Sequence, residues 1–154
     1  MSAMMDLLAA ARATAGTLVG DNCSFSGVST DSRTISSGEL FIALRGDHFD
    51  GHHYVAAAQK RGAAAAVVAG DAAEQLRAAG LPLVVVAETR LSLGALAADW
   101  RNRFTLPLIA VTGSNGKTTT KEMIASILRM AYGEHVLSTQ GNYNNDIGLP
   151  LTLL

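Results

Sequence analysis

The sequence predicts an α/β fold whose sheet is at least partly parallel. The first observation is that short apolar runs alternate with segments of helical periodicity between residues 63 and 100, which is typical of strands joined by crossover helices. The second is an apolar run over residues 108–111 that leads into a glycine-rich turn and then a helical pattern. With 154 residues, the chain is long enough for one ordinary domain, or one domain and a piece of another.

The first part of the chain contains less regular elements. Residues 1–16 predict an amphipathic helix, and Asp6 stands where a secretory signal would carry positive charge. A β-like segment over residues 22–28 leads into a polar loop, and the apolar run 39–44 predicts a short strand. Residues 54–61 predict a helix that ends at Gly62.

The next elements follow one another regularly. We expect a strand over residues 63–69, a helix capped by Asp71, a buried strand over residues 83–87, and a helix capped by Thr89. The apolar face of that last helix has the i, i+3, i+4, i+7 spacing of an amphipathic helix, in Leu93, Leu96, Ala97 and Trp100.

Pro107 breaks the pattern, and we expect a new unit to begin there. Its predicted elements are a strand over residues 108–111, a helix, a strand over residues 135–138 and a last segment from residue 149. So few elements cannot cover a parallel sheet on both faces. We therefore assign residues 1–105 to one domain and residues 106–154 to the opening of a second, and expect the chain to be part of a longer protein.

The composition is that of a globular protein with no strong charge bias. Hydrophobic residues make up 49% and charged residues 16%, and the net charge is -1. This balance argues against binding to nucleic acid or to a membrane surface, and no apolar run is long enough to span a bilayer. The single cysteine, Cys23, rules out an intrachain disulfide and suits a reducing cytoplasm, where we expect the protein to reside.

The stretch T-G-S-N-G-K-T-T has the layout of a loop that cradles phosphates. Glycines allow backbone amides to face an anion, and the helix behind them adds unpaired donors. Lys117 could reach the outer phosphates, and Thr118 could offer its hydroxyl to Mg²⁺. However, Val111 stands where the common pattern has its first glycine, so an Asn-Gly turn followed by chance by a lysine remains an alternative.

Three motifs resemble one known family. V-T-G-S-N-G-K-T-T-T-K-E-M, residues 111–123, resembles the ATP loop of the Mur ligases, whose glycine spacing is shorter. S-T-D-S-R with G-E-L-F-I-A-L-R-G-D-H-F-D-G-H, residues 29–33 and 38–52, resembles the family's uridine-nucleotide-binding domain. G-N-Y-N-N-D-I-G-L-P-L-T-L-L, residues 141–154, is most similar to the members that add D-alanyl-D-alanine.

The resemblance implies an ATP-dependent amide-bond ligase of peptidoglycan precursor synthesis. Its substrates would be UDP-N-acetylmuramoyl-tripeptide and D-alanyl-D-alanine, and its reaction would pass through an acyl phosphate. ATP and Mg²⁺ are the implied cofactors. Lys117 and Thr118 take the catalytic roles, with Thr118 as the Mg²⁺ ligand. The remaining residues expected to bind ATP are Gly113, Ser114, Asn115, Gly116 and Thr119.

The substrate-binding residues have two interpretations. The resemblance places Ser32 and Arg33 on the uridine nucleotide and puts Asp47 and His48 near the uracil. By residue chemistry alone, Ser32 and Arg33 could equally belong to a polar turn with a solvated arginine. The last expected substrate contacts are Asn142, Asn144 and Asn145, which could instead cap a helix near Pro150.

Other functions remain open at this stage. They are the sister ligase that adds a diamino acid, a folylpolyglutamate-type ligase, a P-loop kinase or GTPase, and a non-catalytic UDP-nucleotide-binding module. We expect a monomer, and we expect the 154-residue chain to be inactive by itself because it carries only part of an ATP site.

Overall fold

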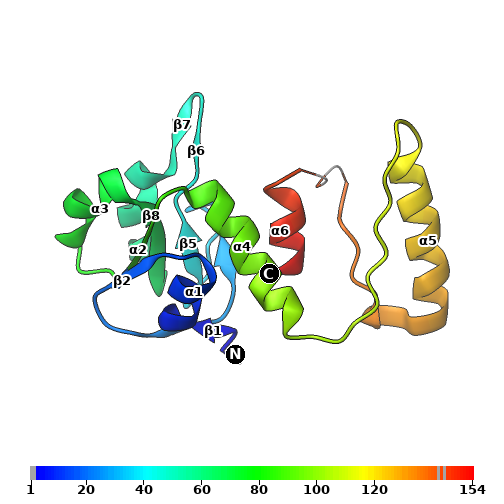
Figure 1. Cartoon of the computed structure of the whole chain (residues 1–154), viewed down its shortest axis with the longest axis horizontal. Coiled ribbons are helices and arrows are strands. Elements are labelled where there is room, and N and C mark those ends of the chain that lie inside the picture. Colours follow the sequence, from blue (N-terminus) through cyan, green and yellow to red (C-terminus); the bar gives the residue numbers. More distant parts are fainter. Residues whose placement is uncertain (1–2, 142, 144) are drawn as a thin grey trace.

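The computed structural model describes residues 3–141, 143 and 145–154. Within them, five strands form one sheet in the order β2-β9-β8-β5-β4 (Figure 1). The four strands from β9 to β4 are mutually parallel, and β2 joins β9 as an antiparallel edge. The strands are β2 (Thr17–Val19), β4 (Val28–Ser29), β5 (Leu40–Ile42), β8 (Ala65–Ala69) and β9 (Leu83–Val86). The predicted α/β class and its parallel sheet are confirmed.

Helices cover both faces of this sheet because successive strand side chains point to opposite sides. Ile42, Val67 and Val84 lie in one apolar core with α1 and α4, whereas Phe41 and Val68 lie in a second core with α2 and α3. The covering helices are α1 (Leu7–Ala13), α2 (Val55–Lys60), α3 (Gly70–Arg77) and α4 (Thr89–Asn102). All five residues of β8 are buried, as expected for the central strand of a sheet covered on both sides.

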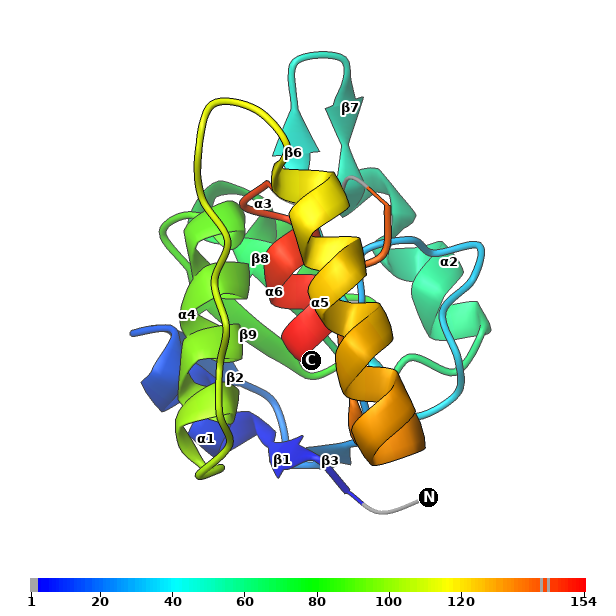
Figure 2. The same ribbon diagram turned by 90° about the vertical axis from the view of Figure 1, so that its right-hand side faces the viewer.

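Three short elements stand outside the main sheet. β1 (Met5–Asp6) pairs with β3 (Ser24–Phe25) beneath α1. After β5, the chain rises into a hairpin of β6 (Arg45–Gly46) and β7 (Phe49–Asp50), which projects above the sheet in Figures 1 and 2. A 3-10 helix, η1 (Gly51–Tyr54), then leads into α2.

His52 fastens this hairpin to the central strand. The His52 side chain is buried, its Nδ1 lies 2.5 Å from Asp50 Oδ1, and its Nε2 accepts a hydrogen bond of 2.9 Å from the Ala69 amide. Since Nε2 is an acceptor, the ring proton lies on Nδ1 and is donated to Asp50. A Cβ on Gly51 would lie 2.7 Å from the Leu44 carbonyl oxygen, so only glycine fits between Asp50 and His52.

Ion pairs fix the hairpin from its outer side. Arg45 Nε lies 3.0 Å from Asp50 Oδ2, and Arg45 Nη1 lies 3.0 Å from Asp71 Oδ2 at the start of α3. Burial would raise the pKa of the Asp50 carboxyl, but hydrogen bonds from the His52 amide and ring and from Arg45 lower it to about 2. The hairpin is therefore held independently at β8 and at α3.

Three predicted boundaries were wrong in detail. The helix predicted to be capped by Asp71 begins at Gly70, so Asp71 lies in its first turn and pairs with Arg45 instead. The helix predicted to be capped by Thr89 is capped by Glu88, whose carboxylate accepts the Arg90 amide, while Thr89 is buried. The single β-like segment over residues 22–28 is two strands, β3 and β4, because each pairs with a different neighbour.

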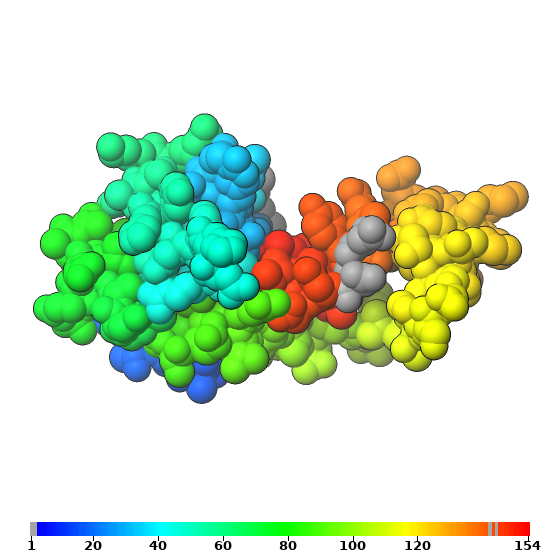
Figure 3. Space-filling model, turned by 90° about the horizontal axis from the view of Figure 1, so that it is seen from above, coloured from blue at the N-terminus to red at the C-terminus, as the bar shows by residue number. Residues whose placement is uncertain are grey.

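The second part of the chain is more open. It contains α5 (Lys117–Tyr132), a 3-10 turn η2 (Gly133–His135) and α6 (Gly148–Leu153). The strands predicted over residues 108–111 and 135–138 do not form, and the described part of residues 106–154 contains no strand. A strand requires a pairing partner, and here Leu108, Ile109 and Leu137 are exposed rather than paired. Figure 3 shows α5 standing apart from the part of the chain that forms the sheet.

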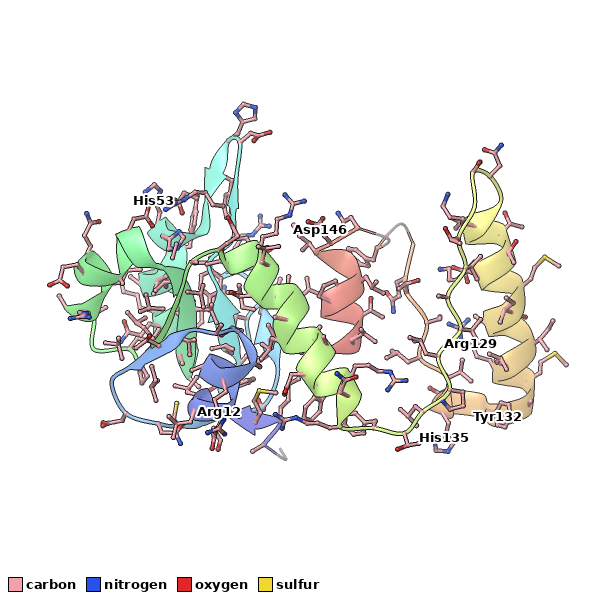
Figure 4. All side chains as sticks on the ribbon, viewed as in Figure 1. Arg12, His53, Arg129, Tyr132, His135 and Asp146 are labelled. Atoms are coloured by element: carbon pink, nitrogen blue, oxygen red, sulfur yellow. The ribbon has the colours of Figure 1, made fainter. Side chains whose placement is uncertain are left out.

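α6 packs on α4 and thereby joins the two parts of the chain. Ile147, Leu151 and Leu154 lie against the first core. Arg90 at the start of α4 forms an ion pair with Asp146, including a 2.8 Å bond from Nη2 to Oδ1. Figure 4 shows Asp146 at the turn that precedes α6. None of the helices in the described residues is long and apolar enough to cross a bilayer.

We expect His52→Leu to lower the free energy of unfolding by about 2–4 kcal/mol, because the Ala69 amide and the Asp50 carboxylate both lose a buried partner. Urea unfolding followed by circular dichroism measures this. His53→Leu is the matched control, since His53 is exposed (Figure 4) and its loss should change stability by less than about 0.5 kcal/mol. Equal effects of the two variants would contradict the role given to His52.

The low pKa of Asp50 predicts acid sensitivity. Its folded-state pKa of about 2 lies below the unfolded value of 3.8, so as the pH falls from about 4 to about 2 the unfolded chain takes up the proton first and stability falls. Asp50→Asn should make that fall shallower, as measured by urea midpoints across this range. Glu74→Gln, at an exposed carboxylate, should keep the wild-type slope, and an unchanged slope in Asp50→Asn would refute the assignment.

Candidate functional site

A pocket of about 350 Å³ lies at the carboxyl edge of the parallel sheet. It is lined by Asp31, Ser32, Arg33, Phe49 and Tyr54. The first three residues follow β4, and the other two belong to the hairpin and 3-10 helix that follow β5. Ligands of open α/β sheets bind outside the carboxyl ends of the strands, so the pocket occupies the position expected for a ligand.

A tight turn shapes one wall of the pocket. Asp31 Oδ1 accepts the Arg33 amide at 2.8 Å, and the Asp31 carboxylate also accepts from Arg33 Nε at 2.9 Å and Nη2 at 2.7 Å. The hydrogen bonds from Arg33 lower the pKa of the Asp31 carboxyl to about 2. The Arg33 side chain remains 85% exposed, so its guanidinium is positioned by Asp31 while it keeps donors free for an anion.

Ser32 differs from its neighbours in being buried. It is 8% exposed and lines the pocket, and no hydrogen bond of its hydroxyl occurs among the described residues. Because no buried side-chain oxygen or nitrogen lacks a partner among the described residues, the hydroxyl oxygen itself must be accessible from the pocket. The Ser32 hydroxyl is therefore available to a ligand, as is the Arg33 guanidinium.

The other residues predicted for this site lie apart from it. Asp47 and His48 form the exposed tip of the β6–β7 hairpin and do not line the pocket. Sequence reasoning missed Asp31, Phe49 and Tyr54 as lining residues. All three stand close to motif residues that it did single out, but only the folded hairpin brings Phe49 and Tyr54 to the turn after β4.

The glycine turn and the helix start of the phosphate loop form as predicted, although the strand expected before them does not. Gly113 has φ of +146° and Gly116 has φ of +77°, conformations that favour glycine. α5 begins at Lys117 directly behind Gly116, and no side chain caps its first amides. These unpaired amides and the positive end of the helix dipole suit an anion such as a phosphate.

The side chains of the loop point into open surroundings. Ser114, Asn115, Thr118 and Thr119 are exposed. Lys117 donates to the Gly113 carbonyl and lies 3.5 Å from the Ser114 carbonyl, so the ammonium group sits over the loop. The structure therefore brings the predicted ATP-binding residues together in one loop and the first turn of one helix.

The Asn-rich block is only partly described. Asn142 and Asn144 lie outside the described residues. Asn145 Oδ1 accepts from the amides of Gly148 at 2.7 Å and Ile147 at 3.3 Å, which is the helix-capping role. The described part of residues 106–154 contains no strand, so no sheet edge there joins this block to the phosphate loop.

Two long side chains of α5 hold the segment before this block. Lys121 Nζ donates to the Thr139 carbonyl at 2.5 Å, and Arg129 Nη2 donates to Ser138 Oγ at 2.5 Å. Figure 4 shows Arg129 on the side of α5 that faces this returning segment. The sequence did not predict these two contacts, because helical periodicity shows which face of α5 is apolar but not which distant residues its polar side chains reach.

A second hollow of about 290 Å³ lies at the carboxyl ends of β8 and β9. Arg45, His52, Asp71 and Glu88 line it, but these groups are occupied by the ion pairs and caps described above. Among the described residues, no three His, Cys, Asp or Glu side chains are grouped so as to hold a metal ion.

Comparison with known families agrees with both parts of the chain. The family model described as "Mur ligase family, catalytic domain" matches residues 24–101, and that of the "Mur ligase middle domain" matches residues 111–154. This chain belongs to the Mur ligase family. Mur ligases are ATP-dependent ligases, so the ATP-binding character predicted from the loop agrees with the family.

Individual Mur ligases give a consistent comparison. The chain is 45% identical over 140 residues to the UDP-N-acetylmuramoyl-tripeptide–D-alanyl-D-alanine ligase of Haemophilus influenzae, covering 89% of this chain and 30% of that protein. A crystal structure of MurF from Acinetobacter baumannii superposes with a TM-score of 0.82 at 40% identity, covering 95% of this chain and 32% of the other. MurF ligase from Thermotoga maritima in complex with ADP superposes with a TM-score of 0.64 at 30% identity, covering 82% and 28%. The chain thus spans about a third of these relatives.

We expect Lys117→Ala to weaken ATP binding to this chain by about tenfold or more, because a charge-assisted contact to phosphate is lost. Calorimetric titration or displacement of a fluorescent ATP analogue measures the dissociation constant. Lys60→Ala, at the end of α2, is the control for loss of one positive charge and should bind like the wild type. Matching affinities in all three proteins would show that the loop does not hold the phosphates.

Proposed function

We propose that this chain forms the nucleotide-binding part of a ligase that joins D-alanyl-D-alanine to UDP-N-acetylmuramoyl-tripeptide. The observation that carries the proposal is the Ser32 hydroxyl, which has no hydrogen-bond partner among the described residues and lies with the Arg33 guanidinium in a pocket at the carboxyl edge of the sheet. A hydroxyl that can donate and accept suits a nucleobase or sugar, and a guanidinium suits a diphosphate. The relatives' names supply the identity of the UDP-linked substrate.

The phosphate loop supports the other half of the proposal. A carboxylate is a poor electrophile, and ATP supplies the phosphoryl group that converts it into an acyl phosphate for attack by an amine. Lys117 and the amides at the start of α5 are placed to offset the negative charge that this transfer brings together. We assign the Mg²⁺ contact to Thr118, whose exposed hydroxyl is in the first turn of α5.

We propose that residues 1–105 form the domain that binds the UDP-linked substrate, and that residues 106–154 begin the ATP-binding domain. Two features support this division. The two family matches lie on either side of residues 102–110. All strands of the main sheet and all fully buried residues of its two cores precede Phe104, and α6 only packs against the first core from outside. We further propose that Asp47, His48 and the Asn-rich block approach the substrate only in the complete enzyme.

We propose a cytoplasmic, monomeric protein. The proposed reaction consumes ATP, which cells hold in the cytoplasm. The single cysteine, Cys23, hydrogen-bonds the Ala64 carbonyl at 3.5 Å, and burial raises the pKa of its thiol, which suits a structural rather than a redox role.

Calorimetric titration of the chain with UDP tests whether residues 1–105 bind the UDP-linked substrate. The wild type should bind UDP, and Ser32→Ala should weaken binding about five- to tenfold through the loss of one hydrogen bond. Ser36→Ala is the matched control, because Ser36 is exposed and outside the pocket. Absence of heat with millimolar UDP, or equal affinity in Ser32→Ala, would contradict the proposed substrate pocket.

A further inference from the structure

Two aromatic side chains form an exposed wall of the Ser32 pocket. The rings of Phe49 and Tyr54 have centroids 5.3 Å apart and planes inclined by 14°, so they are stacked. Phe49 is 49% exposed and Tyr54 is 44% exposed. Both line the same pocket as Ser32 and Arg33. Large aromatic rings normally contribute by being buried, so a stacked pair left open beside a ligand pocket needs an explanation.

The hairpin does not require this pair to hold its position. Asp50, the residue after Phe49, is fixed by His52 and Arg45, and Arg45 also reaches Asp71. His52, two residues before Tyr54, is fixed by the Ala69 amide. The backbone that carries the two rings is therefore anchored by contacts other than their mutual stacking. A surface held in place in advance loses little conformational freedom when a ligand binds.

We propose that Phe49 and Tyr54 form a stacking platform for the heteroaromatic base of the nucleotide held by Ser32 and Arg33; this inference rests on the proposed function. Each of the three groups binds a different part of the nucleotide. The platform stacks on the flat face of the base, and the Ser32 hydroxyl hydrogen-bonds a polar edge. The Arg33 guanidinium, which Asp31 holds through Nε and Nη2, binds the diphosphate.

The platform contributes more to the affinity for nucleotides than to the choice of base. Every base has a π-face, so stacking tolerates different bases, whereas hydrogen bonding to an edge distinguishes them. Loss of one platform ring should therefore weaken all nucleotides that bind in the pocket. Replacement by another flat ring should restore binding.

Titration of the chain with UDP tests the platform. We expect Phe49→Leu to weaken binding about tenfold, whereas Phe49→Trp, which keeps a flat ring, should stay within about twofold of the wild type. Tyr54→Phe keeps the ring without its hydroxyl and should also bind like the wild type, whereas Tyr54→Leu should bind more weakly. Circular dichroism melts of each variant establish that the fold is retained.

A measurement on the wild type makes the test independent of variant folding. On binding, the H5 and H6 protons of the UDP base should move upfield in the NMR spectrum because they enter the ring currents of the platform. Nuclear Overhauser effects should connect them to aromatic protons, and Phe49→Leu should reduce the upfield shift.

The outcomes separate the two proposals. If the wild type binds UDP but Phe49→Leu binds equally well, or if H5 and H6 show no upfield shift, the platform is overturned while the substrate pocket stands. If the wild type fails to bind UDP, both proposals are overturned.

Discussion

One hydrogen bond, from the Ala69 amide to His52 Nε2, connects the central strand of the sheet to the segment that carries Phe49 and Tyr54 in the Ser32 pocket. β8 is buried along its whole length and so has a fixed position. His52 transmits that position to Asp50 and the hairpin, and Gly51 permits the close approach to the Leu44 backbone. In the chain, the pocket residue Phe49 directly precedes the segment Asp50–His52, and the pocket residue Tyr54 follows it after one residue. A site built from loops is therefore anchored to a strand that is buried along its whole length.

The two sites of the chain are built by different means. The phosphate loop is local, since its glycines, its lysine and the helix start follow one another within a few residues, and their backbone conformations suffice to form the cradle. The pocket around Ser32 is tertiary, because its two walls follow different strands and meet only when β4 and β5 pair. A local site can be recognised from its motif, whereas a tertiary one needs the fold.

The second part of the chain shows what an apolar sequence needs in order to become a strand. Residues 108–111 and 135–138 are strand-like in composition, but in the described residues they have no neighbouring strand. Residues 108–111 and 136–138 have no regular structure, and His135 ends the 3-10 turn η2. α5 forms nonetheless, because helical hydrogen bonds lie within the segment itself. α6 forms as well, with Asn145 capping its first turn and α4 covering its apolar face.

The sequence by itself determined the α/β class, the alternation of strands and helices, and the phosphate loop around Lys117, because these depend on local periodicity and local backbone preference. The tertiary structure decided what depends on contacts between distant residues. It buried Ser32 but left Asp47 and His48 on the hairpin tip, and it brought Phe49 and Tyr54 to the pocket. It also engaged Asp71 with Arg45 and made Glu88, instead of Thr89, the cap of α4. No spacing rule encodes these pairings, since each joins groups that only the folded sheet places side by side.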